Sequence, residues 1–150
     1  MKFLLAQINP VVGDLEGNAK KILCIASKAS STSTDLVLTP ELSLWGYPAN
    51  DLLLKKNLIK NQYQILDKLA LDINKKYGGL SITVGIAEIT NDSFFPNLYN
   101  SIALLEHGEW KIIARKIILP TYEVFDEKRY FRSEDKVSIL TKKLKIKLGD

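Results

Sequence analysis

One short stretch decides the fold: residues 35–42 read DLVLTPEL. Its apolar run is too short for a typical helix but fits a strand that is buried on both faces. Pro40 has no backbone N–H and therefore ends the pairing capacity of that strand. Glu41 follows directly, and the active sites of open α/β sheets lie beyond the carboxyl ends of their strands. The stretch predicts an α/β fold with a carboxylate at the end of its sheet.

The rest of the chain extends this pattern in both directions. Short apolar runs predict strands, and apolar residues at helical spacing predict helices that cross between them. Asn18 is the expected N-cap of the first helix. The expected strands cover residues 2–8, 35–40, 80–88, 98–106, 110–118, 137–140 and 144–148, and the expected helices cover residues 18–30 and 57–77. The predicted order is β-α-β-α-β, followed by two hairpins.

The composition indicates one globular domain. The chain has 150 residues, of which 46% are hydrophobic and 25% are charged, as is usual for a globular protein. Its net charge is +4, but no basic stripe with interleaved aromatic residues exists, so we expect no nucleic-acid partner. No apolar stretch approaches the length of a membrane span, so we expect no membrane partner either. The single cysteine, Cys24, allows no internal disulfide and no zinc site, which favours a reducing, cytoplasmic location.

Two charged residues near predicted strand ends are candidates for chemistry. Glu41 could act as a general base. Lys116 could stabilise a developing oxyanion, or keep a neighbouring carboxylate or thiolate charged. Each residue alone also fits a plainer interpretation, as a salt-bridged surface glutamate or an exposed lysine. The segment 125–131, FDEKRYF, places four charges between aromatic residues, which fits either a network around a site or a solvated loop.

Three motifs in order resemble the carbon–nitrogen hydrolase family. The first motif combines AQINP at 6–10 with VGD at 12–14 and Asn18. The second combines PEL at 40–42 with GYP at 46–48 and DLL at 51–53. The third combines RK at 115–116 with LP at 119–120, Tyr122 and VFDEKRYF at 124–131. The resemblance runs from Lys2 to about Gly149. Residues 51–53 and the third motif are similar to one branch, the amino-terminal glutaminase domains of glutamine-dependent NAD⁺ synthetases.

The resemblance implies both a fold and a site. The fold would be the nitrilase-type α-β-β-α sandwich, of which residues 1–150 would form the first part. Glu41 would be the general base that activates a cysteine thiol, and Lys116 would stabilise the tetrahedral intermediate. Glu127 matches a second glutamate near the lysine. Tyr122 matches a position that lines the glutamine pocket.

The resemblance also implies partners. Glutamine would be the substrate, and its ammonia would pass to a separate domain that uses ATP and Mg to amidate a nicotinate dinucleotide. That synthetase domain is absent from these residues, so we expect no metal and no other cofactor in this chain. The full-length enzyme is expected to form a homo-oligomer.

The family nucleophile is missing from these residues. The family places a cysteine, in a Cys-Glu-Asp context, after a strand that resembles residues 145–149, and the chain then ends at Asp150. Cys24 is expected to be a small buried hydrophobe of an amphipathic helix and no substitute. We therefore expect a fragment that cannot hydrolyse glutamine alone and that exposes apolar faces. Two alternatives stay open: a stand-alone amidase of the same superfamily, and a non-catalytic binding or regulatory module.

Overall fold

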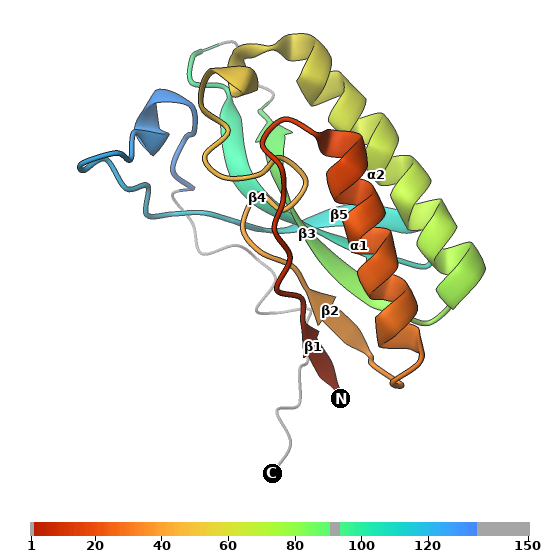
Figure 1. The fold of residues 1–150 in the computed structure, drawn as a ribbon. Coiled ribbons are helices and arrows are strands. Elements are labelled where there is room, and N and C mark those ends of the chain that lie inside the picture. Colours follow the sequence, from red (N-terminus) through yellow and green to blue (C-terminus); the bar gives the residue numbers. More distant parts are fainter. Residues whose placement is uncertain (1, 91–93, 135–150) are drawn as a thin grey trace.

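The computed structural model describes residues 2–90 and 94–134, which form a mixed sheet with two long helices on one face (Figure 1). The strands are β1 (Phe3–Leu5), β2 (Leu36–Leu38), β3 (Ser81–Ile89), β4 (Leu98–Glu106) and β5 (Glu109–Arg115). The long helices are α1 (Leu15–Ser30) and α2 (Lys56–Tyr77), and the 3₁₀ helices are η1 (Asn50–Leu54) and η2 (Glu127–Arg129). The strands expected at 137–140 and 144–148 lie outside the described residues.

The sheet follows the order of the sequence, β1-β2-β3-β4-β5. β1, β2 and β3 are parallel, because α1 and α2 carry the chain back across one face. β3, β4 and β5 are antiparallel. The turn between β4 and β5 uses His107 and Gly108, both with positive φ, as a tight hairpin requires. The predicted β-α-β-α-β order and its first hairpin are confirmed.

The core lies between the helices and the sheet. α1 contributes Ile22, Ala26 and Ala29, α2 contributes Leu66, Leu69 and Ile73, and the sheet contributes Val37, Ile82, Val84 and Ile86. Burying one such large aliphatic side chain stabilises the fold by roughly 1.5–3 kcal/mol. The apolar stripes of both helices therefore fix which face of the sheet they cover.

The expected role of Asn18 is wrong. α1 begins one turn earlier, at Leu15, because Asp14 is the N-cap and its carboxylate accepts a hydrogen bond from Gly17 N at 2.9 Å. Asn18 is fully buried inside the helix. Its amide donates to the backbone oxygens of Val11 at 2.7 Å and Leu44 at 3.0 Å. Asn18 thus ties α1 to the two loops beside it.

A second buried amide, Gln62 of α2, joins three parts of the fold. Its Nε2 donates to Ala87 O at 2.8 Å, and its Oε1 accepts from Ala87 N at 3.0 Å. The same Oε1 accepts the indole N–H of Trp45. A buried amide is tolerated only when it is hydrogen-bonded, and these bonds reach β3 and the loop that carries Trp45. Gln62 therefore fixes the depth at which α2 sits over β3.

The expectation that Cys24 is buried is wrong. The residue is exposed, because α1 directs it away from the sheet.

Large exposed apolar side chains occur on the strands, as expected: Phe3 and Leu5 on β1, Ile89 on β3 and Ile102 on β4. Across residues 2–90 and 94–134, no helix combines the length and the apolar character that crossing a membrane requires.

Candidate active site

The segment that carries Glu41 is fastened along β3 by polar bonds. β2 pairs with β3 only as far as Leu38 and Thr83, so the remaining edge of β3 is free to bind this segment. Thr39 Oγ1 donates to Thr83 O at 2.8 Å, and Leu44 N donates to Gly85 O at 3.1 Å. Gly85 N donates to Ser43 Oγ at 2.9 Å. These bonds hold the residues on both sides of Glu41 against the sheet.

Gly85 lets the backbone of Glu41 and Leu42 come this close. A Cβ atom on Gly85 would lie 2.3 Å from Leu42 N and 2.9 Å from the carbonyl carbon of Glu41. Leu42 is buried and has φ of 44°, a left-handed conformation that a side chain rarely adopts. The tight turn at Leu42 directs Glu41 out over the sheet.

Lys116 joins the two predicted glutamates. Its backbone N donates to Asn100 O at 2.8 Å, which holds the residue just beyond the end of β5. Its ammonium donates to Glu41 Oε1 at 2.8 Å and to Glu127 Oε1 at 2.9 Å. Glu41, Lys116 and Glu127, which are far apart in sequence, therefore converge at one end of the sheet.

These two carboxylates keep the side chain of Lys116 protonated. Burial by itself lowers the pKa of the Lys116 ammonium, but the hydrogen bonds to Glu41 and Glu127 outweigh it and raise the pKa above its usual 10.5. The side chain is 28% exposed, so it is neither dry nor freely solvated. Lys116 is therefore a fixed cation at neutral pH.

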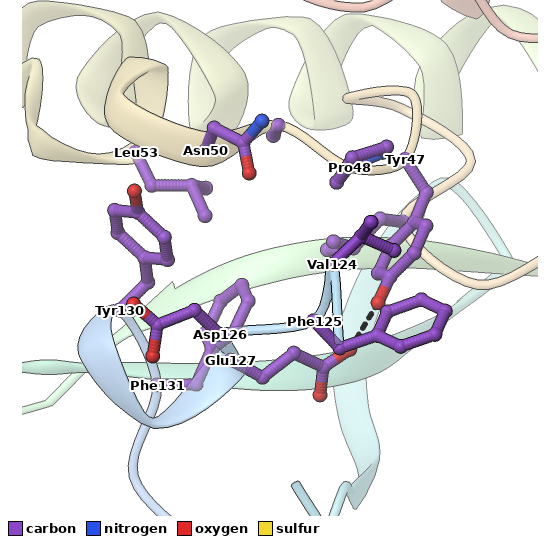
Figure 2. A pocket seen from close by; sticks show the side chains of 12 residues that line it. Tyr47, Pro48, Asn50, Leu53, Val124, Phe125, Asp126, Glu127, Tyr130 and Phe131 are labelled. Atoms are coloured by element: carbon purple, nitrogen blue, oxygen red, sulfur yellow. Dashed lines mark hydrogen bonds between the residues drawn. The ribbon is translucent and has the colours of Figure 1, made fainter. Parts of the chain in front are cut away.

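Glu127 is the buried member of the group. It begins η2 and is 5% exposed. Its Oε1 also accepts a hydrogen bond from the hydroxyl of Tyr47 at 2.8 Å. Figure 2 shows this bond at one end of a small hollow that residues 47–50, Leu53 and residues 124–127 line in part. Within the described residues, its other oxygen, Oε2, is buried and has no hydrogen-bond partner. Burial and the bond to Glu127 raise the pKa of Tyr47, so its phenol stays a donor.

Asn100 is a fourth member, which the sequence analysis missed. It lies on β4, is 5% exposed, and donates from Nδ2 to Glu41 Oε1 at 2.6 Å. A polar residue inside a predicted apolar strand was the available signal. Tyr47 was noticed only as part of a motif, because no local pattern pairs it with a residue 80 positions away.

Tyr122 lies in an aromatic cluster beside this group. It is 63% exposed and contacts Phe125 edge to face at 5.4 Å between ring centroids. Phe125 lies 6.2 Å from the ring of Tyr47. Figure 2 shows Tyr47 and Phe125 close to Glu127, on the side of the hollow away from Leu53. Tyr122 therefore reaches the charged group through two aromatic rings and not by direct contact.

The charged group opens on a cleft of about 310 Å³, lined in part by Thr39, Glu41, Asn100, Ile102 and Lys116. That volume falls at the small end of the range for ligand sites. The cleft offers a carboxylate and an ammonium side by side, which suits proton transfer and oxyanion stabilisation. Among the described residues, no cluster of His, Cys, Asp and Glu could hold a metal ion.

Arg115 anchors the strand end that precedes Lys116. Its guanidinium forms a two-point contact with the carboxylate of Glu88, including a bond of 2.7 Å from Nε, and a bond of 2.8 Å to Glu134. It also lies 4.5 Å from the ring centroid of Tyr99. These hydrogen bonds, that to Glu88 first, raise the pKa of Arg115. The end of β5 is therefore rigidly placed.

A family comparison matches nearly the whole chain. The sequence model for the carbon–nitrogen hydrolases matches residues 5–149. The chain is 41% identical over 132 residues to a glutamine-dependent NAD⁺ synthetase of Synechocystis sp., covering 88% of this chain and 24% of the relative. It is 36% identical over 140 residues to that of Thermotoga maritima, covering 93% and 23%. The chain thus spans about a quarter of the length of these relatives.

Solved structures agree with the fold. The glutamine-dependent NAD⁺ synthetase of Acinetobacter baumannii, in complex with ADP, superposes with a TM-score of 0.78 and 35% identity, covering 89% of this chain and 24% of that one. An amidase from Nesterenkonia sp. superposes with a TM-score of 0.71, covering 91% and 49%, but at 24% identity it shows the fold alone. The α/β fold is therefore the first portion of a nitrilase-type domain, as expected.

Proposed function

Because this chain belongs to the carbon–nitrogen hydrolase family, we propose that it forms the first portion of a glutaminase domain in a glutamine-dependent NAD⁺ synthetase. The observation that carries the proposal is the convergence of Glu41 and Glu127 on Lys116, with Glu41 and Lys116 lining the cleft. The similarity to synthetases, at 41% and 36% identity for the two relatives named above, favours this branch over the amidases.

The proposed reaction is the hydrolysis of the side-chain amide of glutamine. Glu41 takes the proton from a cysteine thiol as the sulfur attacks the amide carbonyl carbon. Lys116 stabilises the negative charge that develops on the carbonyl oxygen. The carbon–nitrogen bond breaks, and the departing nitrogen takes the proton from Glu41 and leaves as ammonia. Water then hydrolyses the thioester, which gives glutamate and restores the thiol.

The nucleophile is proposed to come from another part of the protein. Cys24, the single cysteine of the 150 residues, is exposed on α1 and does not line the cleft. The 150-residue chain alone is therefore proposed to be inactive. Glu127 is the second glutamate of the site, and it holds Lys116 in place from the buried side.

The remaining roles are also proposals. Tyr122, at the outer end of the aromatic cluster, would line the path of glutamine into the cleft. The ammonia would be used by a separate domain that binds ATP and Mg and amidates a nicotinate dinucleotide. The full-length protein would act as a homo-oligomer. A stand-alone amidase would need no such domain.

The test uses the full-length gene product and glutamine. We expect ammonia release, and a covalent adduct detectable by mass spectrometry whose added mass matches a glutamyl thioester. Glu41→Gln and Lys116→Met should each abolish both signals, whereas Cys24→Ser should change neither. Ammonia release that does not depend on Glu41 would contradict the proposed mechanism. A well-folded protein with neither signal would instead favour the non-catalytic module.

A further inference from the structure

The two carboxylate oxygens of Glu41 lie in different surroundings. Oε1 accepts two hydrogen bonds, from Lys116 Nζ at 2.8 Å and from Asn100 Nδ2 at 2.6 Å. Oε2 accepts none from the residues that the structure describes. Each carboxylate oxygen offers about two lone-pair sites to donors, and both sites of Oε1 are occupied by these two bonds. Oε2 is therefore the oxygen better suited to act as a base.

Asn100 is well placed to maintain this asymmetry. It lies inside β4, where it pairs with Ala87 of β3, and only 5% of its surface is exposed. A carboxylate can only accept hydrogen bonds, so the amide must present its NH₂ group to Glu41. The carbonyl of the same residue accepts the backbone N–H of Lys116 at 2.8 Å. One residue of β4 thus sets the position of both charged groups.

We propose that Asn100 is a positioning residue, which holds Oε1 of Glu41 and so leaves Oε2 as the oxygen that takes the thiol proton. This inference rests on the proposed glutaminase function. Lys116 alone would not fix the carboxylate, because a flexible ammonium with three donors can follow either oxygen. The short, buried amide of Asn100 reaches only one of them. Without it, the carboxylate could rotate and present the lysine-bonded oxygen to the nucleophile.

Two other roles for Asn100 predict different kinetics. If Asn100 bound glutamine directly, removing its amide would raise KM. If it only packed β4, removing it would lower stability without lowering kcat of the folded enzyme. A positioning residue acts in the transition state, so its loss should lower kcat and leave KM unchanged.

The experiment compares three variants of the full-length gene product by their glutamine hydrolysis. Asn100→Ala removes the donor, and Asn100→Asp keeps the side-chain volume while replacing the donor with a second carboxylate. Trp110→Phe is the matched control, because it removes the 2.7 Å hydrogen bond that the indole N–H of Trp110 donates to the carboxylate of Asp67. Trp110 lies on β5 at the end of the strand away from Lys116. Folding of each variant is first checked by circular dichroism.

We expect Asn100→Ala to lower kcat by roughly ten- to a hundredfold, as the loss of a hydrogen bond to a charged group implies, with KM unchanged. Asn100→Asp should be at least as slow, and Trp110→Phe should keep the wild-type kcat. A wild-type kcat in folded Asn100→Ala, or a raised KM with unchanged kcat, would overturn the inference. If Asn100→Ala fails to fold, Asn100→Asp decides in the same way. A wild-type protein that releases no ammonia identifies a failure of the proposed function itself.

Discussion

Replacement of Gly85 by alanine should separate Glu41 from its partners. The added Cβ would lie 2.3 Å from Leu42 N, about 1.1 Å inside the 3.4 Å at which ordinary contact begins. Backbone cannot swing aside as a flexible side chain does, so the segment around Leu42 must move by about that amount. The shift would strain the 3.1 Å bond from Leu44 N to Gly85 O and the 2.6 Å bond from Asn100 to Glu41.

Overpacking of this kind costs about 1–3 kcal/mol of stability. For a domain of roughly 150–250 residues, this lowers Tm by about 2–12 °C. A misplacement of about 1 Å at a catalytic group lowers turnover by roughly a hundredfold. Calorimetry and glutamine hydrolysis of the full-length gene product measure the two effects.

Gly78→Ala is the control for this prediction. Gly78 has a negative φ of −48°, and a Cβ there would meet only Asn74 O at 3.4 Å. Alanine at such a position is neutral, or stabilises by up to about 1 kcal/mol. A Gly85→Ala protein with the Tm and turnover of the Gly78→Ala protein would refute the reasoning that the glycine is needed for close approach.

Three further predictions concern single side chains. The pKa of Lys116 is raised above 10.5, so its contribution to stability is complete below pH 10.5 and declines as the pH rises through the raised value. As the pH rises from neutral, the difference in unfolding free energy between wild type and Lys116→Met should therefore shrink only in that alkaline range; a decline that begins near neutral pH would contradict it. Tyr47→Phe removes the 2.8 Å bond to Glu127 and should cost about 1.5–3 kcal/mol in calorimetry, while an unchanged Tm would argue against that bond. Cys24 should react with a thiol reagent without denaturant, and Cys24→Ser should keep full turnover; slow labelling would contradict its exposed position.

The sequence predicted the elements of the fold well and their ends less well. Apolar periodicity is a local property, so the five strands of the described residues, the two long helices and the first hairpin were found. The N-cap was misplaced because Asp14 and Asn18 both lie near the helix start, and only the structure shows that Asn18 binds Leu44. The exposure of Cys24 depends on the rotation of α1 about its axis, which its apolar neighbours did not settle.

The charged site was predicted through motif resemblance and not through periodicity. Their positions near strand ends made Glu41 and Lys116 candidates, but each alone also fitted a plainer surface role, and their pairing depends on the register of β3, β4 and β5. Asn100 could not be found in this way, because its role depends on a partner 59 residues earlier in the chain. Long-range hydrogen bonds of this kind leave no pattern within a window of ten or twenty residues.

The ion pair between Lys116 and Glu41 also has a consequence for synthesis on the ribosome. The two residues are 75 positions apart. At about 5–20 residues per second, Lys116 is made roughly 4 to 15 seconds after Glu41. Throughout this interval the carboxylate of Glu41 lacks the ammonium of Lys116. Until Asn100 is made, it also lacks the amide of that residue. The carboxylate of Glu41 is therefore paired only with water until the hairpin of β4 and β5 brings Asn100 and Lys116 to it, and 44% of its side chain stays exposed afterwards.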